Sequence, residues 1–555
     1  MGPITLTILI PLIGMVLLLL VPERFDKAIK WLTVLFTGSA FLSSLGLLNL
    51  FHSGTFHFQL VESAPWIPAW GIQYKVGIDG ISIWLFMLTT LLTLLATVFS
   101  FYIDKRPRIY FAMMLLLEAA MLGVFVSMDM ILFYSFFELT LIPMAVMIFI
   151  WGGSNRNYAA IKFFLYTFAA SIFMLLGMIA LAKRHEALTG TMSFDITAIQ
   201  SLVASGEFWQ GTGNLQMILF WAMTVALLVK CPMFPFHTWL PDAHTEAPTA
   251  GSVILAGVLL KMGTYGLLRF SLPFFPEAAQ AAVWPLMALS VIGIIYGAAV
   301  AAVQPDVKKL VAYSSVAHMG FVVFGIFSLN QAGMIGGAYQ QLNHGISTGA
   351  LFLLIGLIYE RTHTRAFKDY GGLKAQMPVF SALFLIVMLS SVGLPGMNGF
   401  VGEFLALYGG FMAAVQGQFG LGMAFPLLAG TGVILAAAYL LHMFRQVFYG
   451  PLNPNLARLK DLKPWEVGLV GIFIIFIFWG GLYPNTFLKP MERSIGAVRM
   501  MALNKPGERP DWADQAHEVD AQGNLVTVNG RTPDGDIDEA NGYQIVAPAD
   551  FYSQK

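Results

Sequence analysis

The feature that most limits how this chain can fold is a series of apolar segments that recur from the first residues to about residue 486. Each segment reaches the roughly 20 residues that an α-helix needs to cross a hydrocarbon core of about 30 Å. Of the 555 residues, 57% are hydrophobic and only 11% are charged, and this charged share is under half that of an average soluble domain. The sequence therefore predicts an all-α integral membrane protein.

The apolar segments predict about fourteen transmembrane helices. The expected spans cover residues 4–21, 29–51, 78–102, 109–128, 130–151, 157–182, 214–240, 247–271, 279–303, 308–328, 333–359, 378–414, 424–448 and 465–486. Segment 52–77 is long, aromatic and half apolar, so the number of spans is open by one. Residues 1–486 therefore form the expected membrane domain.

The distribution of lysine and arginine predicts the orientation, because these residues concentrate in cytoplasmic loops. Alternate connections carry Arg24, Lys27, Lys30, Lys105, Arg106, Arg108, Arg156, Lys308, Lys309, Arg361, Arg365, Lys368, Lys374, Arg458, Lys460 and Lys463. The other connections carry only Lys75, Lys183 and Arg184. We therefore expect both termini on the extra-cytoplasmic face, which requires an even number of spans. Residues 487–555, a polar and acidic tail, are expected on that face too.

Two of the expected spans contain helix breakers. The seventh reads LLVKCPMFPFHTWLP and the twelfth reads SSVGLPGMNGFVGEF, with prolines in both and glycines in the second. Proline removes a backbone donor, and within a bilayer the freed groups are tolerated only inside protein or beside water. Broken helices five spans apart suggest a repeat of five helices, and such repeats often have inverted topology.

Six ionisable residues lie near the middle of apolar spans, where a charge that faces lipid costs several kcal/mol. They are Glu138, Lys230, Lys261, His318, His344 and Glu403. Because residues at the middle of neighbouring helices share one depth, the six are expected to form a polar row along the membrane plane. A lysine in a low-dielectric site exchanges its proton more readily than in water, a nearby glutamate favours the charged lysine, and histidine relays protons. The row therefore predicts a proton path.

Other polar residues in or beside the spans have simpler interpretations. Ion pairing or snorkelling is the expected role of Lys162, Arg269 and Arg445. Packing or a loop position is the expected role of His237, His244 and His442. Glu118 stays open between a packing hydrogen bond and a functional role, and Asp79 stays open between a helix cap and a functional role.

The sequence indicates no cofactor in this chain. Cys231 is the single cysteine, so no CxxC motif for a cluster or zinc exists. His318 and His344 lie on separate spans without a second histidine, which disfavours haem. No dinucleotide-binding or phosphate-binding glycine motif is present, and a net charge of zero gives no indication of nucleic-acid binding.

Four segments closely resemble the antiporter-like subunits of respiratory complex I. They are FFELTLIPM around Glu138, the block from Lys230 to Phe270, QPDVKKLVAYSSVAHMGF around His318 and QLNHGISTGALFLLIG around His344. The resemblance covers residues 1–486. Glu403 favours the M-type branch, because L-type, N-type and Mrp D-type subunits usually have lysine there. The missing lateral helix of L-type subunits also favours it.

The resemblance implies fourteen helices with two inverted five-helix repeats, at about 109–271 and 279–448. It implies that Glu138 and Lys230 form a modulating pair, that Lys261 passes protons through the two histidines, and that Glu403 is the terminal carrier. NADH oxidation and quinone reduction would occur in other subunits, so that this chain is part of an enzyme without doing redox chemistry itself. It also implies L-type and N-type neighbours and a bacterial inner membrane.

Three alternatives to this function stay open at this point. An Mrp-type sodium/proton antiporter subunit would be driven by ion gradients, and a membrane-bound hydrogenase subunit would have another redox partner. A structural anchor would carry the polar row as a vestige. The long acidic tail departs from the usual M-type pattern.

Overall fold

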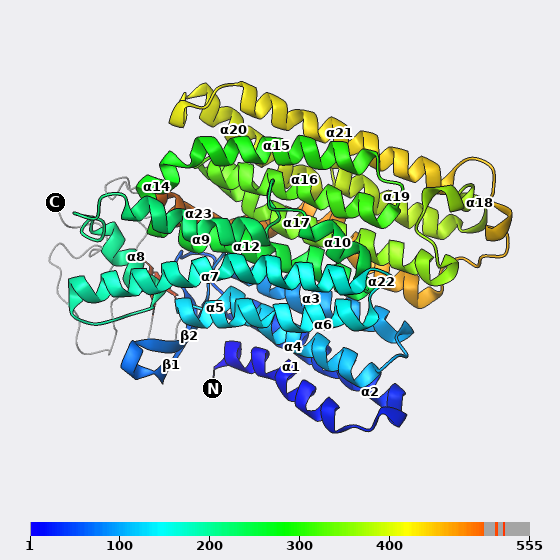
Figure 1. The fold of residues 1–555 in the computed structure, drawn as a ribbon, viewed down its shortest axis with the longest axis horizontal. Helices are drawn as coiled ribbons and strands as arrows, with labels where there is room; N and C mark the ends of the chain where they lie inside the picture. Colours follow the sequence, from blue (N-terminus) through cyan, green and yellow to red (C-terminus); the bar gives the residue numbers. More distant parts are fainter. Residues whose placement is uncertain (1, 504–516, 520–524, 528–555) are drawn as a thin grey trace.

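The computed structural model describes residues 2–503, 517–519 and 525–527. Its main feature is a bundle of near-parallel helices, from α1 and α2 on one side to α20 and α21 on the other (Figure 1). Within the described residues, 13 helical segments are long and apolar enough to span a membrane. The expected all-α membrane class is therefore confirmed.

The first half of the chain begins with two outer helices and continues into the bundle. Its helices are α1 (Pro3–Leu20), α2 (Asp26–Leu50), α3 (Ser82–Phe99), α4 (Pro107–Val126), α5 (Met130–Leu139), α6 (Leu141–Trp151), α7 (Arg156–Thr189), α8 (Ile196–Ala204), α9 (Leu215–Lys230), α10 (Trp239–Glu246), α11 (Thr249–Ile254), α12 (Leu260–Gly266) and α13 (Leu272–Phe274). Helices α11 to α13 make one continuous span, Thr249–Phe274.

The second half has the same helical character. Its helices are α14 (Pro276–Ala281), α15 (Val283–Ala302), α16 (Val307–Phe327), α17 (Gln331–Thr362), α18 (Leu373–Gln376), α19 (Pro378–Val392), α20 (Asn398–Val415), α21 (Ala424–Phe448), α22 (Pro464–Leu482) and α23 (Asn485–Leu503). Two short strands, β3 (His517–Val519) and β4 (Leu525–Thr527), pair antiparallel.

Both predicted helix breaks are confirmed. The seventh span ends its first half at Lys230 and resumes at Trp239, and Trp239 Nε1 donates to Val229 O at 2.9 Å across the break. The twelfth span is divided between α19 and α20, with Gly393 at φ +82° and Gly396 at φ +92°. These positive φ values are readily available only to glycine. The two helices next to the breaks, α9 and α19, are therefore shorter than a full span.

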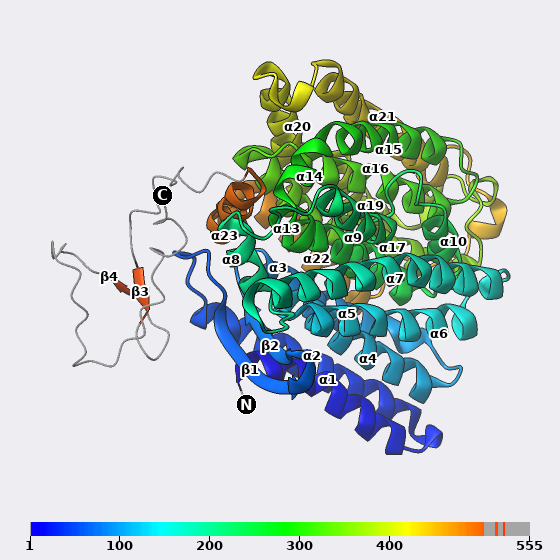
Figure 2. The same ribbon diagram turned by 60° about the vertical axis from the view of Figure 1, so that its left-hand side comes forward.

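Segment 52–77, which left the number of spans open, contains no membrane-spanning helix. It contributes β1 (Gln59–Ile67) and β2 (Ile72–Ile78), which pair as an antiparallel hairpin at one end of the bundle (Figure 2). Lys75 of β2 forms an ion pair with Asp195, the residue that caps α8. Met128 N donates to Lys75 O at 2.8 Å. The hairpin is thus tied to the connections around it.

Helix α23 lies across the same end of the bundle and packs against α13, α14 and α17 (Figure 2). Gly80 N donates to Ser494 Oγ at 3.1 Å, and Arg499 Nε donates to Leu329 O at 3.2 Å. The segment expected to be a polar tail from residue 487 therefore begins inside a helix that is anchored to the bundle. Residues 504–516, 520–524 and 528–555 lie outside the described part.

Burial separates inner helices from outer ones. The most apolar windows of α16 and α17 are each 94% buried and that of Thr249–Phe274 is 100% buried, whereas that of α1 is 33% buried. The outer helices expose leucine, isoleucine and phenylalanine, as lipid-facing surfaces do. The inner helices are those that carry Lys261, His318 and His344, so these polar side chains are kept away from lipid.

Candidate functional site

The first part of the predicted row lies at the break of the seventh span. Lys230 ends α9 with its side chain buried, its Nζ donates to Thr140 Oγ1 at 3.3 Å, and it lies 4.6 Å from the centre of the Phe137 ring. Glu138 of α5 is within electrostatic range of Lys230, and Ser171 of α7 faces its carboxylate. No direct ion pair joins Glu138 and Lys230 among the described contacts. The two side chains are therefore close enough to interact electrostatically, but they form no direct ion pair.

Lys261 lies in a distorted part of its helix. Two π-helical turns, Leu255–Leu259 and Leu267–Ser271, flank α12 on both sides. Lys261 is fully buried, and its Nζ donates to Ala256 O, a carbonyl of the first π-helical turn. Its Nζ also lies 2.7 Å from His344 Nδ1 on α17. The first π-helical turn therefore supplies the buried amine with an acceptor, and such turns often occur at functional sites.

The row continues through two adjacent histidines to a carboxylate. The rings of His344 and His318, which belong to α17 and α16, have centroids 5.6 Å apart. His318 Nδ1 lies 2.8 Å from Glu403 Oε1, and Gln340 Nε2 donates to the same oxygen at 2.9 Å. All of these side chains are buried. Lys261, His344, His318 and Glu403 are therefore joined in series.

Some nitrogens along this series have no partner. Nε2 of His318 and Nε2 of His344 are buried and accept or donate no hydrogen bond within the described residues. In the Glu138–Lys230 pair, Glu138 Oε1 is also buried and has no hydrogen-bond partner within the described residues. Lys230 and Lys261 are not in direct contact, but their helices pack closely, since a Cβ on Gly263 would lie 2.5 Å from Leu227 O. The six residues thus form two hydrogen-bonded pairs, Lys261–His344 and His318–Glu403, whose histidine rings are neighbours, and a looser third pair, Glu138 and Lys230.

Of the residues with simpler expected roles, several have the expected partners. Arg269 forms a buried ion pair with Asp79, and Asp79 also caps α3 by accepting from Ile81 N and Ser82 N. Lys162 pairs with Asp242 at 2.7 Å. Arg445 and His442 are exposed on α21. Glu118, fully buried on α4, has no partner for either carboxylate oxygen within the described residues.

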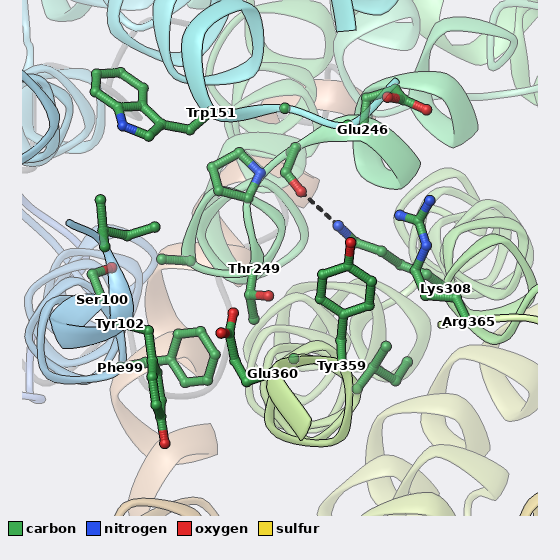
Figure 3. A pocket seen from close by; sticks show the side chains of 18 of the residues that line it. Phe99, Ser100, Tyr102, Trp151, Glu246, Thr249, Lys308, Tyr359, Glu360 and Arg365 are labelled. Atoms are coloured by element: carbon green, nitrogen blue, oxygen red, sulfur yellow. Dashed lines mark hydrogen bonds between the residues drawn. The ribbon is translucent and has the colours of Figure 1, made fainter. Parts of the chain in front are cut away.

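A cavity that the sequence did not indicate lies at the end of the bundle opposite α23. It encloses about 180 Å³ between the ends of α3, α6, α11, α16 and α17. Figure 3 shows Lys308 and Arg365 on one side, Phe99 and Tyr102 on the other, and Glu360 between them. Lys308 is buried and donates to Ala247 O at 2.6 Å. The sequence places Lys308 at the start of an expected span, beside a basic connection, and the packing of α10 against α16 contributes to its burial.

The contact between α17 and α20 positions Glu403 and predicts a sensitive glycine. A Cβ on Gly409 of α20 would lie 2.2 Å from Gly333 Cα and 2.5 Å from Gly333 N. Gly409→Ala should push α20 from α17, lower the free energy of unfolding by about 1–3 kcal/mol and weaken proton transfer. Thermal unfolding and pumping assays check this. Gly430→Ala on α21, where nothing lies within 4 Å, is the matched control and should neither lower the free energy of unfolding nor weaken proton transfer; equal behaviour of the two variants contradicts the close contact.

Fold and site together define a class, an antiporter-like polytopic membrane protein with a buried ionisable row. Residues 127–425 match the family model described as NADH:quinone oxidoreductase/Mrp antiporter, TM. Among the described residues, no group of three histidine, cysteine or acidic side chains is placed to hold a metal ion.

Comparison with curated relatives narrows this class of proteins to one family. Subunit M of NADH-quinone oxidoreductase from Rhodobacter capsulatus is 46% identical over 464 residues, 83% of this chain and 88% of the relative. Its counterpart in Rickettsia prowazekii is 42% identical over 497 residues, 89% of this chain and 97% of the relative. A chain of respiratory complex I from Thermus thermophilus aligns with a TM-score of 0.78 and 31% identity, over 90% of this chain and 99% of that chain. The chain therefore belongs to the NADH-quinone oxidoreductase subunit M family, which confirms the resemblance.

Proposed function

We propose that this chain moves protons across the membrane as the M-type subunit of complex I, through Glu138, Lys230, Lys261, His344, His318 and Glu403. The observation that carries the proposal is the series from Lys261 to Glu403, in which Lys261 contacts His344, His318 contacts Glu403, and the two histidine rings have centroids 5.6 Å apart. Such a series lets a proton move by short steps between groups that both bind and release it. In this proposal NADH oxidation and quinone reduction take place in other subunits.

The Glu138–Lys230 pair has the properties of a control element. Among the described residues, the direct partners of the Lys230 ammonium are a hydroxyl and an aromatic ring, so its charge depends on the distance to Glu138. Approach of the carboxylate favours the charged amine, and withdrawal favours release of a proton toward Lys261. Since the pair lies where α9 ends and where α5 meets α6, a small movement of either helix end changes that distance.

The two histidines supply the middle of the path. Their Nε2 atoms have no partner within the described residues, and the centroids of the two rings are 5.6 Å apart. We propose that a water molecule between the rings joins them. Each ring uses its Nδ1 toward a different end of the row, Lys261 for His344 and Glu403 for His318. A proton entering at one Nδ1 can therefore leave through the other ring.

We further propose fourteen spans, with two inverted repeats at about 109–271 and 279–448. Joining α9 with α10 and α19 with α20 adds one span to the 13 long segments. The basic connections lie on the cytoplasmic side, at the end that contains the cavity, and both termini with residues 487–555 lie outside. The membrane is a bacterial inner membrane, and L-type and N-type subunits are the neighbours.

The experiment that separates complex I from an Mrp antiporter or a hydrogenase is mass spectrometry of the gently solubilised native complex. We expect peripheral iron–sulfur and flavin subunits to co-purify with NADH:quinone activity. Co-purification with small membrane subunits alone, without redox activity, would assign the row to gradient-driven exchange.

The proton path is tested with Lys230→Ala and Glu138→Ala in inverted membrane vesicles. Each variant should assemble, retain NADH oxidation by an artificial acceptor, and lose quinone-coupled pumping by at least about tenfold. The exposed ion pair of Lys183 and Glu186 gives the matched controls, Lys183→Ala and Glu186→Ala, which should pump normally. Full pumping by the Lys230 and Glu138 variants refutes the assigned pair.

A further inference from the structure

Gln340 of α17 is a buried amide at the end of the proposed row, and the row itself does not use it. Its side chain is 2% exposed, and its Nε2 donates to Glu403 Oε1 at 2.9 Å. The same oxygen lies 2.8 Å from His318 Nδ1. A glutamine amide is not titratable, so Gln340 carries no proton. Because burying an amide costs free energy unless it is hydrogen-bonded, its place here depends on the bond that it makes to Glu403.

The orientation of the Gln340 amide is set by two neighbours. While its Nε2 donates to Glu403, its Oε1 accepts from Asn343 Nδ2 at 3.4 Å. If the amide were turned over, its N–H group would face the N–H group of Asn343 and its oxygen would face the oxygen of Glu403. Both bonds would then be lost, because an amide nitrogen only donates and an amide oxygen only accepts. The donor of Gln340 therefore stays on the carboxylate of Glu403.

The residue before Glu403 leaves room for this amide. A Cβ on Gly402 of α20 would lie 2.4 Å from Gln340 Oε1 and 2.9 Å from Asn343 Nδ2. Any side chain at position 402 would therefore displace the two amides. Because Gly402 has none, the amide of Gln340 packs against the backbone of α20, one residue from the carboxylate that it contacts.

The start of α20 is tied to α17 by a second amide, that of Asn398. Its Oδ1 accepts from Ser347 Oγ of α17 at 3.3 Å and from Ser390 Oγ of α19, and its Nδ2 donates to Asn343 O at 3.4 Å. Asn398 thus joins both sides of the α19–α20 break to α17. Glu403 follows five residues later along α20, about 7.5 Å further on. The backbone of Glu403 is therefore fixed relative to α17, and rotation of its side chain remains.

We infer that Gln340 is a positioning residue of the proposed path, one that holds Oε1 of Glu403 against His318 Nδ1. The terminal torsion of a glutamate side chain is broad and roughly two-fold, so a carboxylate without the amide turns more freely away from the ring. A displacement of about 1 Å at such a step can slow it by up to about a hundredfold. The inference rests on the proposed function of the row.

The proton transfer that Gln340 supports is a single step between two side chains. The proton leaves Nδ1 of the His318 imidazolium and forms an O–H bond on Oε1 of the Glu403 carboxylate. The ring becomes a neutral imidazole with its remaining proton on Nε2, and the carboxylate becomes a neutral acid. Gln340 keeps both of its amide protons throughout, and the step needs no other reactant.

The first test removes the donor and keeps the space filled. Gln340→Met in inverted membrane vesicles should lower quinone-coupled pumping by about tenfold, with NADH oxidation by an artificial acceptor unchanged. Gln341→Met is the matched control, because Gln341 is the next residue of α17, is 1% exposed, and accepts from Thr264 Oγ1 at 2.9 Å instead of contacting Glu403. It should pump normally. Normal pumping by Gln340→Met, or an equal loss in both variants, overturns the inference.

A second variant keeps this test valid if Gln340→Met fails to assemble. Serine is polar but too short to reach Glu403, so Gln340→Ser should show the same loss of pumping as the methionine variant. Gln341→Ser is its control and should pump normally. Normal pumping by Gln340→Ser in an assembled complex overturns the inference.

The second test separates positioning from packing. Infrared difference spectra of the complex during turnover should contain the C=O band of protonated Glu403, which Glu403→Gln removes and thereby assigns. A carboxyl group that loses a hydrogen-bond donor absorbs at a different frequency, so the band should move in Gln340→Met and stay in place in Gln341→Met. A band that does not move in Gln340→Met shows that the amide does not act on Glu403, and it overturns the inference even where pumping is lowered.

The two proposals fail in different ways. Loss of pumping in Lys230→Ala together with normal pumping in Gln340→Met removes the positioning role and leaves the row intact. Normal pumping in both Lys230→Ala and Glu403→Gln removes the row itself.

Discussion

Replacing Lys261 by methionine is expected to abolish quinone-coupled proton pumping, by at least about a hundredfold, in a complex that still assembles. Lys261 Nζ contacts both the first π-helical turn, through Ala256 O, and the histidine series, through His344 Nδ1. Methionine fills the buried space with a flexible apolar chain but neither binds nor releases a proton. Proton pumping and quinone reduction are measured together in vesicles.

Two further variants decide why the amine matters. Lys261→Arg keeps a positive charge, but a guanidinium does not release its proton in proteins, so this variant should be as inactive as Lys261→Met. Lys162→Met is the control, because Lys162 is partly exposed and pairs with Asp242. It should pump normally. Full pumping by Lys261→Arg means that Lys261 supplies a fixed charge and leaves proton exchange to other groups.

Several ionisable residues of the row lie where the helices are irregular. Lys230 ends a half-helix, Lys261 lies between two π-helical turns, and Glu403 lies close to Gly393 at the α19–α20 break. Helix ends leave carbonyls without an intrahelical donor, and Lys261 Nζ donates to a carbonyl of a π-helical turn, Ala256 O. The irregularities and the buried charges therefore support each other, and this explains why both occur in the same spans.

The residues of the row were predictable from the sequence, but their contacts were not. A charged group within an apolar run is detectable without any structure, because its cost in lipid demands a polar interior. Prolines and glycines likewise marked both breaks. The partner of Lys261, however, is a histidine 83 positions away, and helix packing alone brings the two together. Sequence spacing carries no information about that contact.

Features that depend on tertiary burial were missed for the same reason. Lys308 is at the start of a span, where lysines usually reach water, yet it lies beneath the end of α10. The two π-helical turns around Lys261 leave no mark in the pattern of apolar residues. The sequence did not predict the hairpin of β1 and β2, because the segment that forms it is half apolar throughout. Each of these three features depends on contacts with neighbouring helices, which the sequence alone does not give.

The largest expected effect on stability belongs to the buried ion pair of Asp79 and Arg269. Their side chains are 2% and 5% exposed, and the pair joins the start of α3 to the second π-helical turn beyond Lys261. Arg269 also packs over Phe58 at 4.7 Å and Tyr265 at 5.0 Å. Removing one partner of such a pair leaves an uncompensated buried charge, at a cost of about 3–5 kcal/mol.

The two single variants should differ in a defined direction. Asp79→Asn keeps the oxygen that accepts from Ile81 N and Ser82 N but leaves the guanidinium without an anion, and arginine cannot lose its charge. Arg269→Met leaves a carboxylate that keeps two backbone donors and can be neutralised by a proton. Asp79→Asn should therefore lower the unfolding free energy more than Arg269→Met. The double variant should be less destabilised than the sum of the two.

Chemical denaturation of the purified complex, followed at this subunit, measures these differences. Arg108→Met is the control, because Arg108 and Glu23 form a partly exposed pair at 3.8 Å, and such pairs contribute at most about 1 kcal/mol. Additive single effects would mean that Asp79 and Arg269 act independently, Asp79 as a helix cap and Arg269 through its aromatic neighbours. Strong coupling would instead identify the pair as the fixed point against which the distorted helix of Lys261 is held.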